Sequence, residues 1–265
     1  MREETVAGPH GRAVSETLRA FLIRVLPPGF RKWVRTQQRR FGIHWPPTGR
    51  VEFGQLRRPT PISRVFGLDR GLHISRYYIE RFLDQNAAAI QGRVLEFGDP
   101  YYTLKFGGPR VTHSDVVNVA PGDPCTTIVA DLARGEAIPT GTFDCIICTQ
   151  TLQMIYDVRA ALGNLARILK PGGVLLITTH GISQIGRFEG VDRWGEYWRF
   201  TSQSLKKLVP EFFSPEEVTV TAYGNVLAAV AHLHGLAVGD VTPEELDDHD
   251  PAYEVIIGVR AVKLK

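Results

Sequence analysis

Residues 143–180, FDCIICTQTLQMIYDVRAALGNLARILKPGGVLLITTH, decide the fold of this 265-residue chain. The stretch opens with the apolar run FDCIICTQ and closes with GVLLITTH, and both runs are typical of buried strands. Between them, from Val158 to Leu169, apolar residues recur at helical spacing. A strand, a helix and a second strand form a βαβ unit, so the two strands are expected to run parallel.

The same alternation continues on both sides of this unit. Strand-like segments precede it at RVLEFG from Arg93, RVTHSDVV from Arg110 and TTIVAD from Thr126, and EVTVTAYG and YEVIIGVRAVKL follow it. Helical patterns lie between several of these segments. The sequence therefore predicts an α/β fold over residues 74–265, with a doubly wound, mostly parallel seven-stranded sheet and helices on both faces.

Residues 1–73 are predicted to form a basic helical extension and a connector. Apolar residues at helical spacing indicate one amphipathic helix within residues 14–26 and a second from Phe30 to Phe41, and a Pro- and Gly-containing connector follows. Residues 1–76 contain 15 Lys and Arg against 5 Asp and Glu, although the whole chain has a net charge of only +3. Packing on the main domain or on a partner subunit, including a homodimer, is favoured; weak membrane-surface contact and nucleic-acid contact are the alternatives.

Composition and missing motifs exclude several classes of protein. No apolar run approaches the roughly 18 to 20 residues of a membrane span, and the N-terminus has no apolar signal-peptide centre, so a cytoplasmic location is expected. The histidines lack metal-ligand spacing, and Cys145 and Cys148 lie three apart in a predicted strand, where they face opposite sides, so no metal site is predicted. No P-loop or nucleophile elbow supports an NTPase or a hydrolase.

Polar residues occur where the predicted strands end, which is where ligands of such sheets bind. The residues at these positions are Glu96 and Gly98, Asp115, Asp131 and Leu132, Thr149 and Gln150, and His180, and all but Gly98 and Leu132 are polar. Carboxylates accept hydrogen bonds from ribose hydroxyls and balance a cationic amino-acid tail. We therefore expect three acidic groups from successive strand ends to converge on a nucleoside cofactor.

Three segments, VLEFG, VADLARGEAIPTGTFDCIICTQTLQMIYD and LARILKPGGVLLITTH, resemble successive motifs of class I S-adenosylmethionine-dependent methyltransferases of the type 11 kind. The resemblance covers about residues 74–222 and implies a Rossmann-like domain with S-adenosylmethionine as cofactor. It implies specific contacts as well: Glu96 and Gly98 at the methionine portion, Asp115 at the ribose, Asp131 and Leu132 at the adenine, and Thr149 and Gln150 at the sulfonium.

The segment after Gly98 departs from the family pattern. Asp99-Pro100-Tyr101-Tyr102 stands where the family has its second and third glycines, which let the backbone approach the cofactor closely. Either the loop takes another path around the cofactor, or the cofactor site is degraded. The polar residues at the other strand ends favour the first interpretation.

Candidate acceptor residues follow the fourth and fifth strands. His180 is the leading general base for a hydroxyl acceptor, with a structural histidine as the alternative. Tyr156 could orient the acceptor. The cluster Trp194, Tyr197, Trp198 and Arg199 could bind it, since aromatic faces stack on sugars and Arg binds phosphate or carboxylate, although a packed lid uses the same residue types.

A weaker resemblance suggests which acceptor the chain uses. DRGLHISRYYIERFL and WGEYWRFT are similar to segments of a bacterial subgroup that modifies glycans or natural products. This resemblance implies methyl transfer to an oxygen, with nitrogen second, of a sugar, glycan or other small-molecule acceptor. A nucleic-acid methyltransferase is an alternative that the lack of an N-P-P-Y-like tetrad disfavours. A non-methylating binding or scaffold protein of the same fold is another.

Overall fold

A computed structural model describes residues 26–41, 52–135, 137–187 and 195–264 of the chain. The chain divides into two compact units, Met1–Arg57 and Arg58–Lys265. The boundary predicted at residue 73 lies within the second unit and stays a prediction. Within the first unit, α2 (Pro28–Arg40) agrees with the second predicted helix, and η1 (Gly54–Leu56) is a short turn. The helix predicted within residues 14–26 lies almost wholly outside the described residues.

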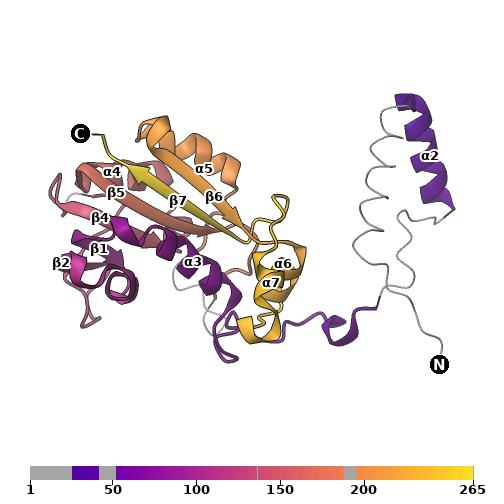
Figure 1. The fold of residues 1–265 in the computed structure, drawn as a ribbon, viewed down its shortest axis with the longest axis horizontal. Coiled ribbons are helices and arrows are strands. Elements are labelled where there is room, and N and C mark those ends of the chain that lie inside the picture. The colour runs from indigo at the N-terminus through magenta and orange to yellow at the C-terminus, as the bar shows by residue number, and fades with distance from the viewer. Residues whose placement is uncertain (1–25, 42–51, 136, 188–194, 265) are drawn as a thin grey trace. The chain divides into compact units, whose positions relative to one another are not determined.

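A seven-stranded sheet in the order β3-β2-β1-β4-β5-β7-β6 forms the centre of the second unit (Figure 1). Every neighbouring pair from β3 to β5 is parallel, whereas β7 is antiparallel to both β5 and β6. The predicted mostly parallel sheet of seven strands is therefore confirmed. The strands are β1 (Gly92–Phe97), β2 (Val111–Asn118), β3 (Ile128–Val129), β4 (Phe143–Thr149), β5 (Leu169–His180), β6 (Val218–Tyr223) and β7 (Ile256–Val262).

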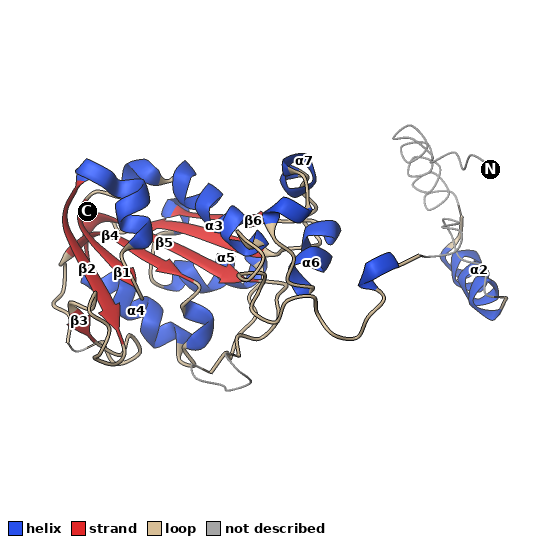
Figure 2. Cartoon of the chain, turned by 90° about the horizontal axis from the view of Figure 1, so that it is seen from below, coloured by secondary structure: helices blue, strands red, loops and turns tan. Residues whose placement is uncertain are grey.

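Helices cover both faces of this sheet (Figure 2). They are α3 (Ile74–Gln85), α4 (Val158–Ile168), α5 (Ser202–Leu208), α6 (Val226–Leu233) and α7 (Pro243–Asp247), with short turns η2 (Ala87–Ala89), η3 (Thr103–Gly107), η4 (Gly108–Arg110), η5 (Leu152–Met154), η6 (Val209–Glu211), η7 (Pro215–Glu217) and η8 (Val238–Asp240). Side-chain caps begin the longer helices; for example, the Asp157 carboxylate accepts the amide N–H of Ala160 at the start of α4.

Successive side chains of each strand point to opposite faces of the sheet, so the core consists of two layers, one on each face. Leu95, Ile146 and Cys148 pack with α4 and α5 on one face, while Val94 and Cys145 pack with α3 and α6 on the other. Cys145 and Cys148 thus lie in different layers, as predicted, and burial raises the pKa of both thiols to about 12. Across the described part of the chain, every helix is too short or too polar to cross a bilayer.

Candidate active site

The loop after β1 is held by a buried carboxylate. Glu96 is 1% exposed, and its two oxygens accept the backbone N–H groups of Tyr102 at 3.0 Å and Thr103 at 2.7 Å. Burial raises the pKa of Glu96 to about 7 in spite of these hydrogen bonds. Helical turns therefore begin soon after Gly98, and the Glu96 side chain accepts hydrogen bonds from the amide groups at their start.

An open space lies beside Gly98, where β1 ends. This residue has φ +89°, and a Cβ atom added to it would meet no atom within 4 Å. Asn118, the last residue of β2, donates from its side-chain amide to the Gly98 carbonyl at 3.2 Å and to the Thr126 hydroxyl at 2.8 Å. Two neighbouring strand ends are therefore tied together beside Gly98, which is exposed.

Asp115 does not lie at a strand end, and that expectation is wrong. It stands three residues before the end of β2, beside Leu95, and is 4% exposed. Its carboxylate accepts hydrogen bonds from Arg93 at 2.7 Å and from the Thr127 hydroxyl at 3.1 Å. Leu95 belongs to the α4 and α5 layer, so Asp115 and Glu96 lie on opposite faces of the sheet and the expected convergence of three carboxylates does not occur.

Asp131 and Leu132 follow β3, as the sequence predicted. Leu132 is 5% exposed and joins the core, whereas the side chain of Asp131 is half exposed. One oxygen of Asp131 accepts the backbone N–H of Ala133, and the other pairs with Arg134 at 3.6 Å. The carboxylate thus stays accessible in the turn after the strand.

Strained backbone and an unsatisfied amide mark the end of β4. Gln150 has φ +51°, a conformation that a non-glycine residue rarely adopts, and its side chain donates to the Thr178 hydroxyl at 3.2 Å. Gln153 in turn donates to the Gln150 carbonyl and side-chain oxygens, while its own buried Oε1 has no partner among the described residues. Strain and orphaned buried polar atoms occur disproportionately at functional sites.

His180, the last residue of β5, lies in a buried aromatic cluster. Its ring packs near Phe66, at 6.3 Å between centroids, and near His232, at 5.7 Å, and Phe66 itself has φ +61°. Both ring nitrogens of His180 are buried and lack a partner in the described structure, although Glu196 Oε1 lies 4.0 Å from Nδ1. Burial, with positive charge nearby, lowers the pKa of His180 to about 3, and burial lowers that of His232 to about 4.

The predicted acceptor residues come together in part. Tyr156 stacks on Trp198 at 6.0 Å and contacts Tyr197 edge-on at 5.4 Å, and the Trp198 indole donates to the carbonyls of Ile155 and Tyr156. The Arg199 guanidinium binds Glu196 and the Gln184 carbonyl, which leaves it fewer donors for an anion. Trp194 lies outside the described residues.

The segment 197–200 connects the ends of β4 and β5. The amides of Tyr197 and Trp198 donate to the Gln153 carbonyl, and the amide of Phe200 donates to the carbonyl of His180. The aromatic cluster and His180 therefore belong to one edge of the sheet, although they come from segments far apart in the sequence.

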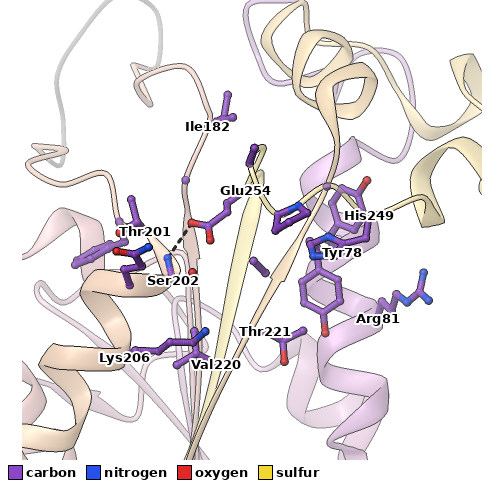
Figure 3. A pocket seen from close by; sticks show the side chains of 18 of the residues that line it. Tyr78, Arg81, Ile182, Thr201, Ser202, Lys206, Val220, Thr221, His249 and Glu254 are labelled. Atoms are coloured by element: carbon purple, nitrogen blue, oxygen red, sulfur yellow. Dashed lines mark hydrogen bonds between the residues drawn. The ribbon is translucent and has the colours of Figure 1, made fainter. Parts of the chain in front are cut away.

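A cleft of about 1070 Å³ begins at Gly181 and Ile182, directly after His180 (Figure 3). Thr201, Ser202 and Lys206 line it on one side of the strands, and Tyr78, Arg81 and His249 line it on the other. The Ser202 amide donates to Glu254 at 2.8 Å within the cleft. Most of the residues that line the cleft carry hydroxyl, amide or charged groups, so it can hold a polar ligand larger than a few atoms.

The residues at the carboxyl edge fit a nucleoside cofactor with an amino-acid tail. The space beside Gly98 admits a ligand against the backbone, and the Asn118 side-chain oxygen and the accessible Asp131 carboxylate can accept hydrogen bonds from hydroxyl and amine groups. The unpartnered Gln153 oxygen adds an acceptor at the next strand end. Glu96 is less suited to direct contact, because both its oxygens already bind the loop backbone.

Sequence reasoning missed four residues of this edge: Asn118, Gln153, Phe66 and His232. Asn118 is the last polar residue before the Ala120-Pro121-Gly122 turn, and that turn was the available signal for the end of β2. Phe66 and His232 reach His180 through tertiary contacts from distant segments, for which the sequence carries no local signal.

Comparison with known proteins gives one family match. A family model described as a methyltransferase domain matches residues 72–221. The ubiquinone/menaquinone biosynthesis C-methyltransferase of Enterobacter sp. (strain 638) is 29% identical over 133 residues, which cover 38% of this chain and 50% of that protein. The chain thus spans about half the length of the curated relative it matches.

Solved structures of similar fold share little sequence with this chain. A SAM-dependent methyltransferase from Archaeoglobus fulgidus is 12% identical with a TM-score of 0.49, and covers 71% of this chain and 94% of its own. The N-methyltransferase NodS from Bradyrhizobium japonicum WM9, in complex with S-adenosyl-L-homocysteine, is 15% identical with a TM-score of 0.46, and covers 77% and 97%.

Proposed function

The chain belongs to the methyltransferase domain family, and from this membership we propose that it transfers a methyl group from S-adenosylmethionine to an acceptor. The open space beside Gly98, bordered by the end of β2, is the observation that carries the proposal. Bound there, S-adenosylmethionine supplies a methyl group already activated on a sulfonium. The protein's task is then to position the acceptor and to exclude water.

In this proposal, side chains at the strand ends hold the cofactor. Asn118 accepts hydrogen bonds at the ribose in place of Asp115, and Asp131 with Leu132 borders the adenine. Thr149 and Gln150 border the sulfonium side. Glu96 contributes indirectly: it does not contact the cofactor, but it holds the loop that follows Gly98 in place.

The acceptor is proposed to be a hydroxyl compound, such as a sugar, glycan precursor or other polar small molecule. The cleft after His180 supports this class, because its lining offers many groups that hydrogen-bond to hydroxyls. Methylation of oxygen is favoured and methylation of nitrogen is second. The aromatic cluster of Tyr156, Tyr197 and Trp198 provides faces for stacking on a sugar ring.

His180 is proposed to accept a hydrogen bond from the acceptor hydroxyl. Its lowered pKa keeps the imidazole neutral near pH 7, so a nitrogen lone pair is always present. The same low pKa makes it a weak base. His180 therefore contributes to methyl transfer more by orienting the acceptor hydroxyl than by removing its proton. The cytoplasmic location stays a prediction from the sequence.

Titration calorimetry with S-adenosylmethionine tests the proposal. Asn118→Ala should weaken binding by roughly 5- to 150-fold, which corresponds to about 1 to 3 kcal/mol for hydrogen bonds to the ribose. Asp115→Ala is the matched comparison: it should lower the free energy of unfolding, because Arg93 and Thr127 lose their partner, and leave cofactor affinity unchanged. No binding of millimolar cofactor by the wild-type chain would instead support a non-methylating scaffold.

A further inference from the structure

The helix α2 carries an aromatic side and a basic side. At about 100° per residue, Phe30, Trp33, Val34, Gln37 and Phe41 fall within an arc of about 100°. Positions 31, 32, 35 and 39, all Arg or Lys, fall on the opposite side. The helix has five basic residues and no acidic one. Four of the five basic positions are therefore separated from the apolar side, and Arg40 borders it next to Trp33.

The aromatic side of α2 is exposed. Phe30 is 48% accessible, Trp33 is 56% accessible, and Phe41, directly after the helix, is 68% accessible. The rings of Phe30 and Trp33 stack at 5.7 Å between centroids, so they form one continuous apolar surface. Adjacent exposed aromatic residues of this size mark an interaction surface.

We propose that α2 binds the surface of an anionic phospholipid bilayer. A helix that lies in the plane of the bilayer surface buries its apolar side at the acyl boundary and directs its basic side to the phosphates. Each Lys or Arg near an anionic surface strengthens this attraction, and Trp is enriched at membrane interfaces. One orientation of α2 therefore satisfies both sides of the helix.

Other partners match only one of the two sides. A nucleic-acid backbone would contact the basic side and leave Phe30 and Trp33 in water. Pairing of α2 with α2 of a second copy would join the aromatic sides, but it would leave both basic sides without a complementary charge. Charge complementarity therefore favours an anionic lipid surface.

Co-sedimentation of the full chain with vesicles tests the proposal. Wild-type protein should bind vesicles of equal parts phosphatidylcholine and phosphatidylglycerol, bind pure phosphatidylcholine vesicles much less, and dissociate as the salt concentration rises. Phe30→Ser/Trp33→Ser should lower the partition coefficient at least about tenfold, because the apolar contact is lost. Lys32→Glu/Arg40→Glu should lower it by a similar factor, because the net charge of α2 falls from +5 to +1 and its attraction to the anionic surface weakens.

Matched controls lie outside α2, near the boundary between the two units. Phe53→Ser removes an aromatic residue that is 54% exposed, and Arg57→Glu/Arg58→Glu makes the same change of charge. Both should bind like the wild type, and S-adenosylmethionine affinity measured on every variant checks that the second unit stays intact. Absence of vesicle binding, equal losses in the controls, or binding of duplex nucleic acid in place of vesicles would overturn the proposal.

Discussion

Glu96 is expected to make the stability of this protein depend on pH. Its pKa of about 7 in the folded chain lies above its ordinary value of 4.5, so folding favours the protonated carboxyl. The contribution of Glu96 to the stability of the fold is fully present below about pH 4.5 and is lost as the pH rises through about 7. Since one pKa unit corresponds to about 1.4 kcal/mol, Glu96 should lower the free energy of unfolding by about 2 to 3 kcal/mol between about pH 5 and about pH 8.

The variant Glu96→Gln isolates this contribution. An amide has nearly the same shape and does not ionise, so the stability of the variant relative to the wild type should rise by about 2 to 3 kcal/mol over that pH range. The free energy of unfolding of the variant must be compared with that of the wild type at each pH, because His180 and His232 make the stability of both proteins change with pH in the opposite direction. Their lowered pKa values stabilise the fold above about pH 6.5, and that contribution is lost as the pH falls through about 4 and 3.

Urea unfolding of both proteins at about pH 5 and about pH 8 provides the measurement. Glu52→Gln serves as the control, since Glu52 is exposed and its loss should give the same difference at both pH values. A change below about 0.5 kcal/mol between the two pH values for Glu96→Gln would refute the reasoning. The Glu96 carboxylate would then be stabilised by the Tyr102 and Thr103 amides as fully as it is in water.

Two further predictions concern the acceptor side. His180→Ala should lower kcat without changing cofactor affinity. Because the pKa of His180 is about 3, the pH profile of kcat/KM for the wild type should show no inflection near pH 6.5. An inflection there that is absent from the variant would identify His180 as a titrating base. Lys206→Ala should raise the KM for the acceptor by roughly 3- to 10-fold, as expected for loss of one charged hydrogen bond. Lys207 is exposed and lies outside the cleft, so Lys207→Ala should leave this KM unchanged. Equal KM values for the two variants would exclude the cleft as the acceptor site.

Most of the sheet could be predicted because burial leaves a direct signal in the sequence. The central residues of β4 (145–148) and of β5 (174–177) form unbroken apolar runs, as expected for strands covered on both faces. The helix predicted from Val158 to Leu169 is observed as α4, one residue shorter. The short helix α7 was missed, although Thr242 and Glu245 form a capping box there, since five residues are too few to show helical periodicity.

The site was harder to predict, because a functional side chain is defined by where its strand stops. The run RVTHSDVV reads as a strand that carries an acid, and the acid was assigned to the strand end. In the structure β2 continues to Asn118, and Asp115 is bound by Arg93. The strand thus ends three residues later than expected, and Asp115 lies inside the sheet and not at its edge.

The loop after β1 shows why the missing glycines need not abolish cofactor binding. Glycines in such a turn let backbone N–H groups approach a ligand. Here the N–H groups of Tyr102 and Thr103 are bound by Glu96, so this turn has fewer donors to offer a ligand. The space beside Gly98 is nevertheless open, and the side chain of Asn118 borders it. Recognition would then depend on side chains at the strand ends more than on the loop backbone, so affinity for S-adenosylmethionine should be more sensitive to Asn118 than to substitutions at Tyr101.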